Sequence, residues 1–183
     1  SIVLTDNGDG TYSFDAGYDK NAENVVYDRT NGTISNGGSD SSYGLYPIDG
    51  LGYEQDGLLT ATSSINEGVH NGNYALRGES QFVYEKDSNL YFTFTGDDDV
   101  YMFINGKLAL DIGGSHGRCS KTVYLNNLDA EAYGLVDGET ANFAFFYMER
   151  CSDASTFGIK TNMPLVEHEI DVEKNAYSDS NCS

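Results

Sequence analysis

The sequence predicts an all-β protein, and three observations carry that prediction. Glycine is abundant at 21 residues, proline is scarce at 2, and there are 14 tyrosines. Short aromatic or apolar runs recur along the chain, several of them with period-two alternation, and turn residues separate them. Such alternation indicates strands that bury one face. Many short strands with glycine-rich turns indicate either a two-sheet sandwich or a closed barrel.

The first part of the chain contains mostly turn signals. Asn7-Gly8-Asp9-Gly10 favours the positive φ angles of a hairpin turn. Residues 28–44 are rich in Gly, Ser, Asn and Asp, so we expect a surface loop there.

The centre of the chain carries the strand signals. Asn105-Gly106 predicts a tight turn between two of the strands. Only residues 129–133 have a mildly helical pattern. The predicted strands are 81–84, 90–94, 100–104, 107–112, 121–125, 141–147 and 157–161.

The length of 183 residues suits one domain with a substantial core. We expect a single β-sandwich domain over 1–165. Residues 166–183 are acidic, and we expect them to form a C-terminal tail or linker. Since the chain begins abruptly at Ser1, we expect it to be a piece of a longer exported protein.

The formal net charge of −19 excludes two classes of partner. It repels nucleic acid phosphates and anionic membranes, and no stretch is apolar and long enough to span a bilayer. Most of this charge serves solubility, while a small cluster of carboxylates could attract a hard cation such as calcium. The three histidines, His70, His116 and His168, lack the spacing of a zinc site.

Three cysteines are present, at Cys119, Cys151 and Cys182. Cys119 and Cys151 both follow strand-like runs, so they could meet across neighbouring loops. One disulfide with a leftover Cys182 fits an extracellular protein.

The densest signal is the run Asp97-Asp98-Asp99 between two aromatic-rich strands. Adjacent carboxylates repel one another unless they are solvated or neutralised. Calcium would neutralise them, because it takes 6–8 oxygen ligands. A solvated acidic turn is the alternative, and the spacing alone leaves both open.

GDDDVYMFINGKLALDIGGSHG at 96–117 closely resembles the signature of the fibro-slime domain family, within the protective-antigen-type superfamily. Segments 43–50, 70–84 and 145–161 are also similar to this family, so the resemblance covers about 43–163. It implies an antiparallel, jelly-roll-like β-sandwich. It also places the loops of Cys119 and Cys151 near each other, which implies a disulfide between them.

Calcium-dependent lectins of the same superfamily use two adjacent aspartates joined by a cis peptide. The resemblance places Asp97 and Asp98 on that pair, while Asp99 takes the position of a glycine. It also implies a side-chain ligand at Glu149 and carbonyl ligands at Cys151 and Asp153. The lectins have asparagine in place of Glu149; a glutamate holds calcium well but crowds the face open to sugar.

Other candidates for glycan contact are weaker. His116 could bond a sugar, although locking its own loop is favoured, and Arg150 could orient a ligand or form a plain ion pair. With no Trp in the chain, sugar stacking would use tyrosines such as Tyr43, Tyr46 or Tyr133.

The leading hypothesis is a calcium-dependent carbohydrate-binding or adhesion module of a secreted or cell-surface, multidomain protein, with a glycan or polysaccharide as partner. The alternative is a structural matrix or stalk module in which calcium only rigidifies loops. An enzyme is not expected. Glycosidases place two carboxylates at a fixed separation across the scissile bond, which adjacent aspartates in one turn do not provide.

Overall fold

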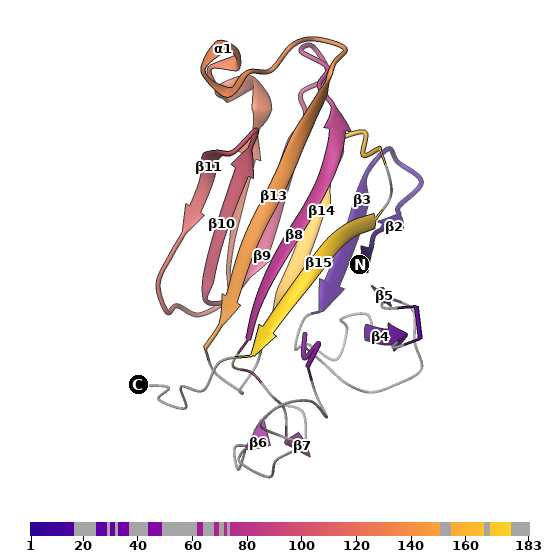
Figure 1. Cartoon of the computed structure of the whole chain (residues 1–183), viewed down its shortest axis with the longest axis vertical. Coiled ribbons are helices and arrows are strands. Elements are labelled where there is room, and N and C mark those ends of the chain that lie inside the picture. Colours follow the sequence, from indigo (N-terminus) through magenta and orange to yellow (C-terminus); the bar gives the residue numbers. More distant parts are fainter. Residues whose placement is uncertain are drawn as a thin grey trace.

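Two mainly antiparallel sheets pack face to face, which confirms the predicted β-sandwich (Figure 1). In this computed structural model the described residues are 1–16, 25–28, 30–31, 33–36, 44–48, 62–63, 68–69, 72, 74–150, 155–166 and 169–176. The short helical elements are η1 (Leu125–Asn127) and α1 (Ala130–Tyr133).

The larger sheet has eight strands, and the pairing between its neighbours is antiparallel except between β1 and β5. In spatial order the strands are β11 (Lys107–Ile112), β10 (Asp99–Ile104), β13 (Thr140–Glu149), β8 (Tyr74–Val83), β15 (Glu169–Ala176), β1 (Ile2–Val3), β5 (Thr33–Asn36) and β4 (Val25–Asp28).

The smaller sheet has five strands, all paired antiparallel. They are, in spatial order, β12 (Cys119–Tyr124), β9 (Tyr91–Gly96), β14 (Phe157–Thr161), β3 (Tyr12–Ala16) and β2 (Thr5–Asp6). A separate pair is formed by β6 (Thr62–Ser63) and β7 (Gly68–Val69).

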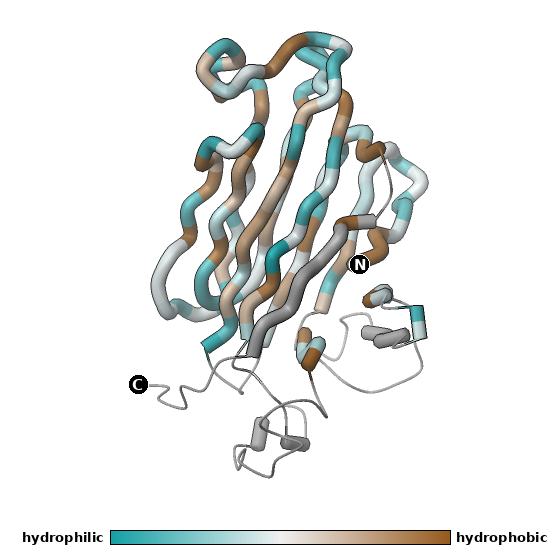
Figure 2. Tube along the Cα trace, in the orientation of Figure 1, coloured by the Kyte–Doolittle hydropathy of each residue, from teal (hydrophilic) through white to brown (hydrophobic). Residues whose placement is uncertain are grey.

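The core lies between the two sheets and is dominated by aromatic rings. Hydropathy alternates along the long strands, as Figure 2 shows, because successive side chains point to opposite faces. Phe143 of the larger sheet contacts Phe92 of the smaller one, with ring centroids 4.9 Å apart. Phe145 and Phe157 pack likewise at 5.6 Å. Such pairs add about 0.5–1.5 kcal/mol each beyond the area they bury.

One glycine is required by this packing. Gly78 on β8 lies directly opposite Phe145 on β13. A Cβ at Gly78 would lie 2.1 Å from a carbon of the Phe145 ring, so only glycine leaves room for the ring.

The central strand predictions are confirmed, although β8 is longer than the predicted strand. The predicted tight turn is also confirmed, with Asn105 and Gly106 at φ angles of 47° and 75°. Two expectations are wrong. Residues 33–36 form β5 inside the predicted surface loop, and residues 169–176 form β15 inside the predicted tail. Backbone pairing to β8 incorporates β15 into the sheet despite its charged sequence.

Candidate functional site

The aspartate run lies in the short connection between β9 and β10, where the chain passes from the smaller to the larger sheet. The connection from β13 to β14 crosses between the same two sheets in the opposite direction. Since β10 pairs with β13 and β9 pairs with β14, the two connections lie side by side. The fold therefore brings residues 97–99 next to residues 149–150 and 155–156.

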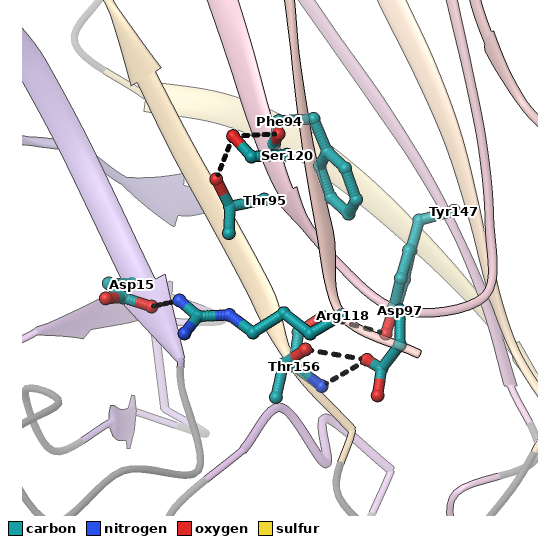
Figure 3. A network of polar contacts seen from close by, with 8 residues as sticks. All are labelled: Asp15, Phe94, Thr95, Asp97, Arg118, Ser120, Tyr147 and Thr156. Atoms are coloured by element: carbon teal, nitrogen blue, oxygen red, sulfur yellow. Dashed lines mark hydrogen bonds and ion pairs between the residues drawn. The ribbon is translucent and has the colours of Figure 1, made fainter. Parts of the chain in front are cut away.

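Asp97 binds the far end of the β13–β14 connection. Its Oδ1 accepts hydrogen bonds from the backbone N–H of Thr156 at 2.7 Å and from the Thr156 hydroxyl at 2.8 Å (Figure 3). Burial raises the pKa of the Asp97 carboxyl, and the two bonds from Thr156 oppose that rise. Its Oδ2 accepts no hydrogen bond from the described residues, so this oxygen is available to a ligand.

Asp98 binds the near end of the same connection. Its side chain is buried, with 5% of the residue exposed, and its Oδ2 accepts a hydrogen bond from the Arg150 N–H at 3.0 Å. Asp98 has a left-handed backbone, with φ of 54°. The cis peptide implied by the resemblance is not found, since the described residues contain no cis peptide bond.

Glu149 lies next to the same backbone N–H of Arg150 that binds Asp98. Its Oε1 lies 3.0 Å from the Arg150 nitrogen, and its Oε2 accepts a hydrogen bond from the Tyr147 hydroxyl at 2.8 Å. Only 3% of Glu149 is exposed. Two buried carboxylates therefore converge on one N–H group, an arrangement that favours a bound cation because the two charges repel each other.

Asp99 has a different role from its two neighbours. Its Oδ2 accepts from Arg150 Nε at 2.7 Å and also contacts Arg150 Nη2, while its Oδ1 accepts from the Gly114 N–H at 2.5 Å. Arg150 thus forms the ion pair that the sequence left open. Asp99 ties the loop after β11 to the end of β13, and both of its oxygens are engaged.

The three aspartates together hold both ends of one short segment. Asp98 and Asp99 bind Arg150 before it, and Asp97 binds Thr156 after it. The segment itself, residues 151–154, lies outside the described residues. The carbonyl ligands expected at Cys151 and Asp153 fall there.

Behind the site lies a buried hydroxyl network that the sequence did not predict. Besides Glu149, the Tyr147 hydroxyl contacts Ser155 Oγ at 3.3 Å. Ser155 Oγ donates to the Leu45 carbonyl at 2.9 Å and contacts the Tyr74 hydroxyl at 3.0 Å. The only signal for it in the sequence is that Tyr147 and Glu149, two residues apart on one strand, face the same side.

Three other candidates for sugar contact form hydrogen bonds within the fold. His116 Nδ1 lies 2.9 Å from the carbonyl oxygen of the adjacent Gly117, a contact within its own loop. Tyr46 is buried and its hydroxyl accepts from Ser155 N, and the Tyr133 hydroxyl donates to the Leu108 carbonyl. These bonds favour structural roles for both tyrosines over sugar stacking.

The cysteine prediction is not met in the structure, where Cys119 carries a free thiol and the implied bridge to Cys151 is not formed. Outside the described residues lie Tyr43, His70, His168, Cys151 and Cys182.

Arg118, next to Cys119 in the chain, extends past Thr156 and forms an ion pair with Asp15 at 4.0 Å (Figure 3).

The acidic side chains around Arg150 can be compared with what a calcium site requires. Among them, no group of three or more His, Cys, Asp or Glu side chains is placed to hold a metal. Asp98 and Glu149 converge as a pair, and Asp97 Oδ2 and Asp98 Oδ1 are without hydrogen bonds from the described part of the chain. This donor set, made only of oxygen, fits a hard cation completed by backbone carbonyls.

A groove lies on the outer face of the larger sheet. It has a volume of about 840 Å³, and its lining includes Phe103, Phe146, Arg77 and Gln81. Phe146 is 42% exposed there.

Comparison with known proteins gives relatives and a family. The chain is similar to three proteins of Dictyostelium discoideum. It is 38% identical to psiC over 131 residues, which are 72% of this chain and 24% of psiC. It is 40% identical to psiH over 121 residues (66% of this chain, 16% of psiH) and 38% identical to psiP over 149 residues (78% of this chain, 18% of psiP). The chain therefore spans less than a quarter of the length of these relatives. No solved structure matches it significantly.

No helix in the described part of the chain is long and apolar enough to cross a membrane. The profile of the PA14 domain matches residues 54–174, which include the aspartate turn, Glu149 and Arg150. The chain belongs to the PA14 domain family.

Proposed function

We propose that this domain is a calcium-dependent carbohydrate-binding module. The observation that carries the proposal is the convergence of Asp98 and Glu149, both buried, on the single N–H of Arg150. Buried ionised carboxylates cost several kcal/mol each unless a cation or hydrogen bonds compensate them. The Arg150 N–H and the Tyr147 hydroxyl bind these carboxylates but leave two like charges side by side, so a divalent cation would stabilise this end of the sandwich.

Calcium would be held by Asp98 and Glu149, by the free Oδ2 of Asp97, and by backbone carbonyls of Cys151 and Asp153. When bound, it would orient two sugar hydroxyls at its open face. Asp99 and Arg150 would act by holding the segment that provides the carbonyls. A shallow site formed by one ion and a few loop groups predicts weak sugar binding, because each sugar hydroxyl exchanges good contacts with water for similar contacts with the protein. We expect a binding free energy of about −4 to −6 kcal/mol.

Membership in the PA14 domain family supports the glycan part of this proposal, because such domains are often carbohydrate-binding or adhesion modules. Within that family, the motif at 96–117 favours the fibro-slime group. The relatives are several times longer than this chain, which supports a module of a larger multidomain protein. We place that protein outside the cell or on its surface.

The test is a glycan array probed with the domain in calcium and again in EDTA. We expect weak binding to one class of glycan that disappears in EDTA and in the variant Asp98→Asn. Binding that survives both treatments would mean that the glycan occupies another surface, and the groove beside Phe103 and Phe146 would be the first to examine. The matched variant Phe146→Ser tests that groove.

A second candidate function is a structural module in which calcium only rigidifies the loops. The observation that favours it is that Asp97 and Asp99 already have good protein partners in Thr156 and Arg150. This function predicts a calcium-dependent rise in melting temperature with no glycan bound on the array. The lectin function predicts the same rise in melting temperature together with calcium-dependent glycan binding on the array.

A further inference from the structure

We propose that Tyr147 is a positioning residue for calcium: its buried hydroxyl fixes Glu149 in the orientation that binds the metal. The inference rests on the proposed function and adds to it a residue that does not contact the metal. The geometry that points to it is the 2.8 Å hydrogen bond from the Tyr147 hydroxyl to Glu149 Oε2, inside the core.

Strand geometry explains why these two side chains meet. On β13, Phe143, Phe145, Tyr147 and Glu149 are all buried and alternate with more exposed residues, so Glu149 continues the row that faces the core. A glutamate in this row has several rotamers within reach of the interior. The Tyr147 hydroxyl selects one of them by holding Oε2, which leaves Oε1 directed at the Arg150 N–H next to Asp98.

Tyr147 is itself held firmly. Its ring packs against Phe157 at 5.0 Å and Tyr74 at 5.9 Å, and its hydroxyl also contacts Ser155 Oγ at 3.3 Å and the Thr156 carbonyl at 3.5 Å. Ser155 and Thr156 follow residues 151–154 and directly precede β14. The same hydroxyl therefore contacts residues on both sides of the segment expected to supply carbonyl ligands.

Removing a residue that orients a metal ligand typically lowers the affinity for the metal by about 10–100-fold. The variant Tyr147→Phe keeps the ring and its packing and removes only the hydroxyl. We expect calcium affinity to fall by about tenfold, at the lower end of that range. Sugar need not be present, because the readout is the binding of calcium itself.

Tyr74→Phe is the matched control. Tyr74 is equally buried and stands beside Tyr147, but its hydroxyl bonds the Leu45 carbonyl and Ser155, whereas the hydroxyl bonded to Glu149 Oε2 is that of Tyr147. We expect Tyr74→Phe to leave calcium affinity within about twofold, although it removes a hydroxyl from the same network. The comparison separates orientation of Glu149 from general loosening of the core.

The experiment is isothermal titration with calcium on five proteins: wild type, Tyr147→Phe, Tyr74→Phe, Glu149→Gln, and the double variant Tyr147→Phe/Glu149→Gln. If Tyr147 acts through Glu149, Tyr147→Phe should have no further effect in the Glu149→Gln background. Equal affinities of wild type and Tyr147→Phe, or equal losses in both tyrosine variants, would overturn the inference. Wild type that binds no calcium would instead overturn the proposed function.

A measurement on wild type covers the case in which Tyr147→Phe does not fold. The chain contains no Trp, so its near-ultraviolet circular dichroism reports mainly tyrosines. Calcium at Glu149 should change the environment of the Tyr147 phenol and alter this spectrum, and Glu149→Gln should abolish the change. An identical calcium response in wild type and Glu149→Gln would contradict the role given to Tyr147.

Discussion

Asp97 is expected to stabilise the fold even without metal, through Thr156. Thr156 is fully buried, and Asp97 Oδ1 accepts from both its N–H and its hydroxyl. Asp97→Ala removes both bonds and leaves a buried N–H without its acceptor, at a cost of about 3 kcal/mol. Asp97→Asn keeps a carbonyl oxygen in the same place, so its cost should be about 1 kcal/mol or less.

Urea denaturation of the metal-free proteins in EDTA measures these differences. In a domain of this size, a loss of about 3 kcal/mol also lowers the melting temperature by about 6–12 °C. Thr156→Val is the matched control, since it removes the hydroxyl bond and keeps the backbone bond, and it should cost about 1 kcal/mol. Equal stabilities of Asp97→Ala and Asp97→Asn would refute the reasoning, because the acceptor oxygen would then contribute nothing.

Three further predictions concern the framework around the site. Gly78→Ala should lower the free energy of unfolding by about 2–3 kcal/mol in urea denaturation, because the added Cβ would overlap the Phe145 ring. Gly106→Ala is the control, since only its φ of 75° is unfavourable there, and a smaller loss in Gly78→Ala than in Gly106→Ala would contradict this prediction. Arg150→Met should cost about 2 kcal/mol by leaving Asp99 buried without its cation, and a thermal melt unchanged from wild type would show that the ion pair is dispensable. Burial raises the pKa of Tyr147 well above 10.0, so the contribution of its neutral phenol to the free energy of unfolding is present below pH 10 and is lost as the pH rises further. The loss of stability at alkaline pH should therefore be smaller in Tyr147→Phe than in the wild type, and identical profiles of stability against pH would refute this.

The strands that form the core could be predicted from sequence because each buries one face. Period-two alternation around Phe92 and Phe143 carries this information locally, and Asn105-Gly106 marks its own turn. β15 could not be predicted in this way. Its sequence is charged, and pairing with β8 and β1, both far away in the chain, makes it a strand.

The contacts of the candidate site could likewise be predicted only in part from the local sequence. The resemblance marked Asp97, Asp98 and Glu149, and the fold brings Asp98 and Glu149 together. Nothing local in the sequence assigns Asp99 to Arg150 or Asp97 to Thr156, because these contacts join residues more than 50 positions apart. They depend on two connections crossing between the same pair of sheets.

The most direct test of the calcium proposal is the melting temperature of the wild type and of Asp98→Asn, each in EDTA and in excess calcium. Asparagine tolerates the left-handed φ of residue 98 and can still accept from Arg150 N, so the variant should fold and lose only the charge. At a calcium concentration of about 100 times Kd, binding adds about 2.7 kcal/mol. This corresponds to a rise of about 5–10 °C in the wild type. We predict that rise for the wild type and little or none for Asp98→Asn; no rise in the wild type, or the same rise in both proteins, would contradict the calcium site at Asp98.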